Sequence, residues 1–190
     1  MFFKMRSAYF VATLASVLTV AAVASAKYSV TAPKILMKAK GPVGVKIDGE
    51  SNDLTFIEGE TNFIFKTKLS KMDTKNPGRN EHMKTRFEAS TFDEITLSVP
   101  KDKVDISNTP KDKEGNDVPR WVKGTLKFHG IEREKLVIGY TVKDKRVNAF
   151  FTFDVLKHNI PEKNLCFEPR TKSICAQKDV ELKVEFTVKE

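Results

Sequence analysis

The stretch LSKMDTKNPGRNEHMKTRFEASTF, residues 69–92, interrupts a chain whose apolar residues otherwise recur at every second position. Such alternation is typical of strands with one buried face. Within the stretch, Asn80 is a candidate N-cap after a Pro-Gly turn, and Met83 and Phe87 are spaced to share one face of a short helix. A helix of about ten residues is marginal alone in water. We therefore expect its Met83/Phe87 face to dock on an apolar surface, the end of a β-barrel.

The segments on both sides predict eight or more antiparallel strands with one apolar and one charged face. Their apolar positions are Tyr28 and Val30; Val43, Val45 and Ile47; Leu54 to Ile57; Phe63, Phe65 and Leu69; Ile95, Leu97 and Val99; Val122, Leu126 and Phe128; Leu136, Ile138, Tyr140 and Val142; Val147, Phe151, Phe153 and Val155; and Val180, Leu182, Phe186 and Val188. Residues 101–120 are the most polar span of the chain after residue 26 and indicate a surface hairpin with a long tip. This all-β pattern fits a closed barrel or a sandwich.

The first 26 residues have the features of a secretory signal peptide. Lys4 and Arg6 precede an uncharged apolar run, and Ala24-Ser25-Ala26 forms an A-x-A cleavage site before Lys27. We expect residues 1–26 to be removed and residues 27–190 to form one domain that is periplasmic or secreted.

Removal of the two basic leader residues from 33 leaves 31 Lys and Arg against 25 Asp and Glu, a net charge of +6. The basic residues are spread singly over strands, without the clustered stripe and stacking aromatics of a nucleic-acid site. We therefore expect no nucleic-acid partner. The charge favours an anionic ligand head group or a transient contact with an anionic membrane surface.

An eight-stranded barrel has an interior that is either filled by its own side chains or holds one small ligand. The sequence leaves both open, because its inward-facing phenylalanines either form the core or line a slot. The candidate contacts to an apolar ligand are Phe63, Phe65, Met83, Phe87, Leu97, Phe128, Tyr140, Phe151, Phe153 and Leu182. The candidate contacts to its head group are Arg79, Asn80 and His82. Arg79 would clamp a phosphate or polarise a quinone-like group while His82 donates a second hydrogen bond; the alternative is a structural ion pair of Arg79 with Asp73 or Glu81.

Four stretches carry a family resemblance. They read MDTKNPGRNEHMKTRFEASTFDEITLSV, VKGTLKFHGIEREKLVIGYTV, FTFDVLKHNI and KDVELKVEFTV. Together they resemble the YceI family of bacterial secreted, lipocalin-like proteins over nearly the whole mature chain. The positions that match the family's motifs are Asp73, Thr74, Arg79, Glu81, His82, Met83, Phe87, Gly124, Leu126, His129 and Gly130. Three departures are Asn80 in place of the usual Asp, the absence of a Tyr-Pro pair before Ile95, and the absence of a His-Ser pair in the amino-terminal strand.

This resemblance implies an eight-stranded or slightly larger antiparallel lipocalin-like barrel with one short helix capping it. It also implies that the lumen holds a polyisoprenoid or similar long-chain lipid, a polyprenyl phosphate or a quinone-like molecule, as ligand and not as cofactor, without catalysis. The segment from Cys166 to Cys175 is an addition to the family pattern.

Cys166 and Cys175 are the two cysteines of the chain. In an exported protein they predict a local disulfide before the last strand. The alternatives, a redox pair or a metal site, fit less well because the spacing is not C-x-x-C and nearby His158 leaves a metal short of ligands.

Two other functions stay open beside a lipid-binding barrel. One is a protein-interaction module with a collapsed core. The other is a small-molecule enzyme that uses Asp73, Arg79 and His82 as an acid-base cluster. The three histidines stand in no spacing with a known catalytic mechanism, so we expect a binding protein and not an enzyme.

Overall fold

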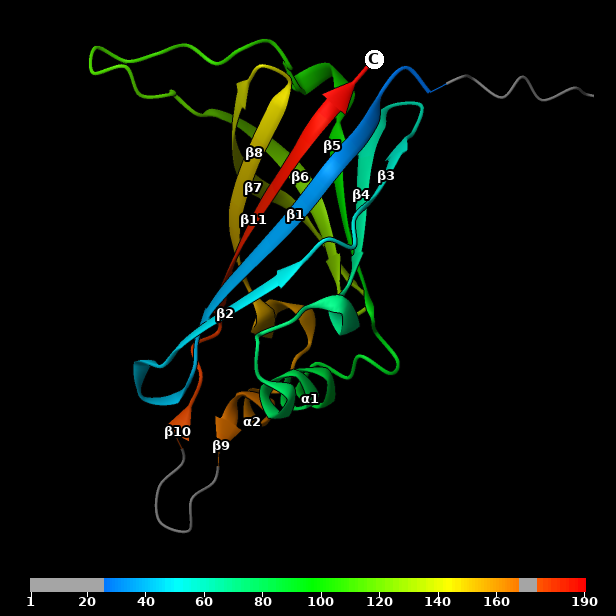
Figure 1. Ribbon diagram of the computed structural model, residues 1–190. Coiled ribbons are helices and arrows are strands. Elements are labelled where there is room, and N and C mark those ends of the chain that lie inside the picture. Colours follow the sequence, from blue (N-terminus) through cyan, green and yellow to red (C-terminus); the bar gives the residue numbers. More distant parts are fainter. Residues whose placement is uncertain (1–25, 168–173) are drawn as a thin grey trace, which may run out of the picture.

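The computed structural model describes residues 26–167 and 174–190. Nine antiparallel strands form one sheet in the order β2-β1-β11-β8-β7-β6-β5-β4-β3. Their bounds are β1 Ser29–Lys40, β2 Lys46–Ser51, β3 Thr55–Glu58, β4 Asn62–Lys68, β5 Glu94–Pro100, β6 Arg120–Phe128, β7 Ile131–Lys143, β8 Arg146–Asp154 and β11 Asp179–Lys189. The sheet curls into a half-barrel, as Figure 1 shows. The predicted all-β barrel of slightly more than eight strands is confirmed. The predicted leader, apart from Ala26, lies outside the described residues.

Strands β2 and β3 are the two edges of the curled sheet. Two contacts, one toward each end of the barrel, join these edge strands to the segments that face them across the seam. Near the end that carries the loop between β5 and β6, here the loop end, the Tyr28 amide donates to Glu58 Oε2 at 2.8 Å. Lys101 donates to the other carboxylate oxygen of Glu58 at 2.7 Å. Toward the opposite end, Glu50 and Asp73 exchange two backbone hydrogen bonds of 2.9 Å. A carboxylate clasp and a backbone bridge therefore close the seam.

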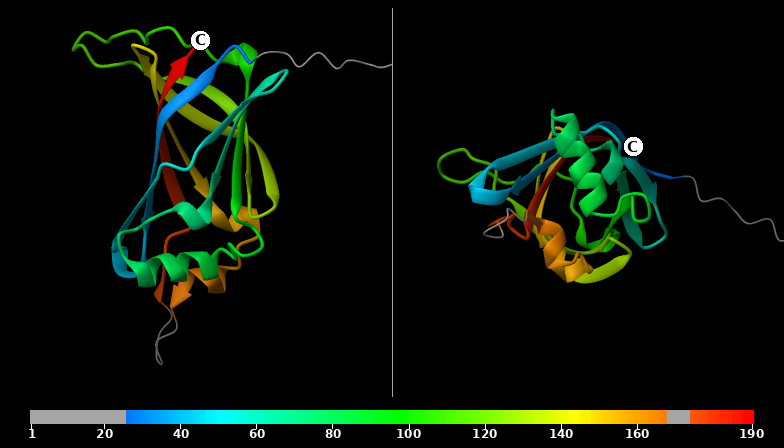
Figure 2. Two further views of the ribbon diagram at one scale, coloured as in Figure 1. Left: turned by 45° about the vertical axis from the view of Figure 1, so that its right-hand side comes forward. Right: turned by 90° about the horizontal axis from the view of Figure 1, so that it is seen from below.

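The stretch that interrupts the alternation forms the 3-10 turn η2 Leu69–Lys71 and the helix α1 Pro77–Arg86. Seen from below, α1 lies across one end of the barrel (Figure 2), here called the helical end. Met83 is buried, and the Phe87 ring meets the ring of Phe128 on β6 at 5.8 Å. The predicted docking of the Met83/Phe87 face is confirmed.

The position of the helix start differs from the prediction, because Asn76 and not Asn80 is the N-cap. The Asn76 side chain accepts from the Arg79 amide, and Pro77 takes the first helical position. Pro suits that position because the first amide of a helix has no intrahelical partner. Arg79 thus lies within the first turn of α1. A second, four-residue helix α2 Glu162–Leu165, which the sequence did not predict, lies at the same end.

The sequence predicted a strand that contains Val43, Val45 and Ile47, and this prediction is wrong for Val43 and Val45. Residues 41–45 form a loop with the 3-10 turn η1 Pro42–Gly44 between β1 and β2. Val43 and Val45 are 86% and 52% exposed. Gly41-Pro42 and Gly44 impose the turn, and Ile47 is the first of the three valine and isoleucine side chains to join a strand.

Candidate functional site

The largest described hollow with an apolar lining is a cavity of about 630 Å³ at the helical end, here called the lower cavity. Its volume lies within the range of roughly 300–1,000 Å³ that is common for small-molecule sites. One side is α1, with Arg79, His82 and Met83, and the facing side is the loop 41–45. Leu165 and Ala176 of the disulfide-linked segment complete the wall. The lining is mostly apolar, with a few polar groups on α1.

Arg79 is the charged group of this wall that lacks a partner. In the described parts of the chain it forms no ion pair, because Asp73 pairs with Lys75 and Glu81 pairs with Lys84. The structural ion pair that was the alternative for Arg79 is therefore not formed. The Arg79 guanidinium is left available, half-buried, at the rim of an apolar cavity.

The other two predicted head-group residues lie differently. His82 is exposed and lines the same cavity as Arg79. Asn80 instead fixes the local backbone, because its Oδ1 accepts from the Thr74 amide at 2.8 Å and from the Thr74 hydroxyl at 2.6 Å. Its amide nitrogen donates to Asp73 at 2.9 Å. Asn80 thus holds the chain before α1, while Arg79 and His82 face the cavity.

The amino terminus of α1 contributes less to anion binding than the sequence suggests. Pro77 has no amide proton, the Arg79 amide donates to the Asn76 side chain, and the Asn80 amide donates to the Asn76 carbonyl. Of these first helical positions, Gly78 keeps its amide free of such a bond in the part of the chain described. An anion at this rim would depend on the Arg79 side chain.

Three smaller hollows continue from the lower cavity along the barrel axis. A waist with about 10 Å³ of free space is lined by residues such as Met37 and Phe87, which also line the lower cavity. Beyond it, an upper hollow of about 90 Å³ shares Ile95 and Leu182 with the waist. A further hollow of about 50 Å³ near Tyr28 shares Phe65 with the upper hollow. The apolar path is therefore continuous in its lining but narrow above the lower cavity.

Aromatic rings form the waist. Phe128 packs against Phe153 with ring centres 5.3 Å apart, and both rings lie edge-on to the ring of His158. His158 is 2% exposed, and its Nδ1 lies 3.1 Å from the Ile131 carbonyl oxygen. Burial lowers the pKa of His158, although the Ile131 and Phe128 carbonyls oppose this effect. The imidazole is therefore a neutral part of the core.

All ten predicted apolar contacts line this path. Around the upper hollow lie Phe63, Phe65, Leu97, Tyr140, Phe151 and Leu182. Phe128 and Phe153 line the waist, and Met83 and Phe87 line the lower cavity. The sequence missed the opposite wall of the lower cavity, which comes from Pro42, Val43 and Val45. The Gly-Pro and Gly signals around these valines could have identified them as a loop.

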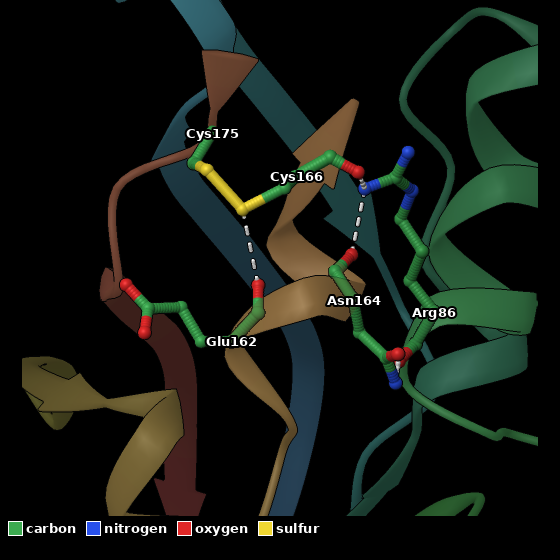
Figure 3. Close-up of a disulfide and its surroundings, with 5 residues drawn as sticks. All are labelled: Arg86, Glu162, Asn164, Cys166 and Cys175. Carbon is green, nitrogen blue, oxygen red and sulfur yellow. Dashed lines mark hydrogen bonds between the residues drawn. A yellow bond between two sulfur atoms is a disulfide. The ribbon is translucent and has the colours of Figure 1, made fainter. Parts of the chain in front are cut away.

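The disulfide follows the cavity-lining Leu165 and precedes the cavity-lining Ala176. Its segment is tied to α1 through Arg86 (Figure 3). Cys166 and Cys175 are bonded and face each other in the two-stranded pair β9 Cys166–Phe167 and β10 Ile174–Cys175. The Arg86 guanidinium donates to the carbonyl oxygens of Asn164 at 2.6 Å and Cys166 at 3.1 Å, while the Asn164 side chain donates to the Arg86 carbonyl. The predicted disulfide is confirmed, and it braces one wall of the cavity.

The proposed acid-base cluster is not assembled. Asp73 bonds to Asn80 and to the Lys75 amide, which together hold the pKa of Asp73 below its usual value. Neither Arg79 nor His82 forms a hydrogen bond with Asp73 within residues 26–167 and 174–190. The described residues also contain no group of three side chains that could hold a metal ion.

The fold and this interior define an antiparallel β-barrel with an apolar path along its axis and a wider cavity under a capping helix. The chain belongs to the YceI family, because the model of the YceI-like domain matches residues 15–188. Neither helix in the described ranges is long and apolar enough to cross a bilayer.

Two solved structures are similar in fold. A polyisoprenoid-binding domain from Saccharophagus degradans, implicated in plant cell wall breakdown, aligns with a TM-score of 0.63 at 16% identity over 86% of this chain and 98% of that one. BcnA from Burkholderia cenocepacia aligns with a TM-score of 0.55 at 14% identity over 83% of this chain and 96% of that one. No curated protein matches the chain.

Proposed function

We propose that this protein binds a long-chain isoprenoid-type lipid and carries or sequesters it outside the cytoplasm. The observation that carries the proposal is the apolar lower cavity of about 630 Å³ with Arg79 at its rim, which has no ion-pair partner among the described residues. An apolar wall favours a hydrocarbon tail because tail burial removes apolar surface from water. Arg79, with His82 beside it, supplies hydrogen-bond donors for a phosphate or a quinone-like head group.

The path above the lower cavity gives the tail a direction. A chain whose head lies at Arg79 would fill the lower cavity first and then pass the ring layer of Phe128 and Phe153 toward Leu182. The similarity in fold to a polyisoprenoid-binding domain supports this choice of ligand. The leader-like residues 1–26 support export to the periplasm or beyond.

A binding role fits the chemistry better than catalysis. A general acid or base must reach the group that it protonates or deprotonates, and Asp73 is engaged with Asn80 and Lys75 instead of His82. One observation favours a second candidate, the interaction module with a collapsed core: the upper hollow is only about 90 Å³.

Native mass spectrometry of gently purified protein separates these functions. We expect a fraction of the protein to carry the mass of a long-chain lipid, and delipidated protein to bind polyprenyl phosphate again. Met83→Asp should abolish this binding, since it places a carboxylate in the apolar wall of the lower cavity. Lys84→Asp on the same helix is the matched control and should not abolish it. Delipidated wild-type protein that binds neither polyprenyl phosphate nor a quinone would contradict the proposal and favour the collapsed module.

A further inference from the structure

The loop 41–45 exposes apolar side chains in a conformation that the local sequence would not choose by itself. Val43 is 86% exposed and has φ of 58°, a backbone region that β-branched residues rarely adopt. Gly44 beside it also has positive φ and open space around its Cα. Val45 is 52% exposed. The tip therefore projects valines into solvent, whereas a surface loop is usually polar.

Positive charge flanks this tip. Lys40 at the end of β1 pairs in register with Lys46 at the start of β2, so the two exposed side chains share one face of the hairpin directly beside the loop. Neither lysine has an ion-pair partner among the residues that the structure describes. The first acidic residue of β2 is Asp48, two pairs farther from the tip and opposite Lys38. The charges in register nearest the valines are thus cationic, while Asp48, Asp179 and Glu181 line the same surface hollow as the two lysines.

The same loop forms one wall of the lower cavity. Pro42, Val43 and Val45 line it opposite Arg79 and His82 on α1. The loop and α1 lie at the same end of the barrel, as Figure 1 shows. A surface that contacts the valine tip is therefore next to the mouth through which a ligand would reach Arg79.

We propose that the loop 41–45 docks on an anionic lipid bilayer, so that lipid passes between the bilayer and the lower cavity without crossing water. The inference rests on the proposed function. An apolar tip with flanking lysines matches the two attractions of a bilayer surface, which are apolar insertion at the level of the head groups and attraction to anionic lipid. The exposed valines gain a nonpolar environment, and Lys40 and Lys46 gain lipid phosphates as partners.

Vesicle co-sedimentation tests the docking. Wild-type protein should bind vesicles of phosphatidylglycerol and phosphatidylcholine, bind phosphatidylcholine vesicles weakly, and dissociate as salt is raised. The variant Val43→Asp/Val45→Asp should bind the anionic vesicles at least about ten-fold more weakly, because it removes apolar contact and adds repulsion. Lys40→Gln/Lys46→Gln should lose the preference for anionic vesicles and keep the weak binding.

The matched control is Val118→Asp, which changes an exposed valine in the loop at the other end of the barrel and should bind vesicles as wild type does. Thermal denaturation should show that all variants fold. Polyprenyl phosphate presented in detergent should bind to Lys40→Gln/Lys46→Gln with near wild-type affinity, because neither lysine lines the lower cavity. This measurement keeps failure of docking distinct from failure of lipid binding. Wild-type protein that ignores anionic vesicles, a valine variant that binds them normally, or a wild-type dimer that the same substitutions dissociate would overturn the proposal.

Discussion

Arg79 carries the electrostatic part of the proposed site. Because its guanidinium has no ion-pair partner in the described chain, Arg79→Ala should leave the melting temperature near that of the wild type. Loss of a charge-assisted hydrogen bond of about 1.5–3 kcal/mol should lower affinity for polyprenyl phosphate roughly ten-fold or more. Affinity for the uncharged polyprenol should change little.

Lys84→Ala is the matched control for Arg79, since it removes the same charge from α1 at a residue that pairs with Glu81 outside the cavity. Binding titrations with the phosphate and the alcohol measure both affinities. Equal affinities of the Arg79→Ala variant and the wild type for polyprenyl phosphate would contradict the head-group role.

His158 should make the fold sensitive to acid. Burial keeps the pKa of the folded imidazole below its unfolded value of 6.5. As the pH falls below 6.5, the unfolded chain therefore takes up a proton that the native protein does not, and the free energy of unfolding decreases. This contribution to stability is complete above that value and is lost on acidification, with a slope of at most about 1.4 kcal/mol per pH unit.

Urea denaturation between neutral pH and moderately acidic pH measures the slope. His158→Gln should show a shallower decrease of unfolding free energy than the wild type. The exposed His82 provides the control, because His82→Gln replaces an imidazole that the fold does not bury. An unchanged slope in His158→Gln would show that other groups cause the acid sensitivity.

Residue types predicted the composition of the interior better than they predicted individual polar roles. Eight of the ten predicted apolar contacts lie on strands, and they line the axial path because period-two alternation determines which face of a strand is buried. Met83 and Phe87 line it because their spacing of four puts them on one face of α1. Asn80 was assigned to the head group, yet it bonds to Thr74 and Asp73. Its role follows from where the helix starts, because Asn76 and not Asn80 is the N-cap of α1.

At the scale of elements, the disulfide-linked pair β9 and β10 should stabilise the fold. Cys166→Ser/Cys175→Ser should lower the free energy of unfolding by roughly 2–3 kcal/mol, since the bond restricts a short loop in the unfolded chain. Urea denaturation measures the change. Reduction of the wild type by dithiothreitol should produce the same shift, whereas an unchanged midpoint in both samples would show that the bond contributes nothing.

Elements whose patterns are long and regular were predicted, and those that depend on distant contacts were not. Alternation predicted β11 over most of its length, and the Met83/Phe87 spacing predicted α1. Helix α2 escaped prediction because its four residues are held by the Arg86 contacts to Asn164 and Cys166, which lie far from Arg86 in the chain. The loop 41–45 escaped because its valines imitate an alternating strand.

For the molecule as a whole, the stacked hollows predict that affinity depends on tail length. Ala149 lines the upper hollow, and Ala149→Leu should reduce the space beyond the waist. We expect this variant to bind farnesyl phosphate as the wild type does and to bind decaprenyl phosphate more weakly. Ala176→Leu narrows the lower cavity and should weaken both ligands.

Competition binding with the two phosphates measures this difference. Thermal denaturation should accompany it, because added methyl groups in a packed core can also destabilise the fold. Unchanged affinity of folded Ala149→Leu protein for decaprenyl phosphate would show that the tail stops at the waist.

The seam between the two edges of the sheet is the place where the perimeter of the barrel can change. Between neighbouring strands the sheet is held by ladders of backbone bonds, but its edges meet through the Glu58 carboxylate and the Glu50–Asp73 bridge. If these two contacts break, the perimeter of the barrel can increase while the hydrogen bonds between neighbouring strands stay intact. Because the cross-sectional area of the barrel rises with the square of its perimeter, a small increase in perimeter would add much space around a lipid tail. We therefore expect a barrel closed in this way to admit bulkier chains more readily than one closed by a strand ladder.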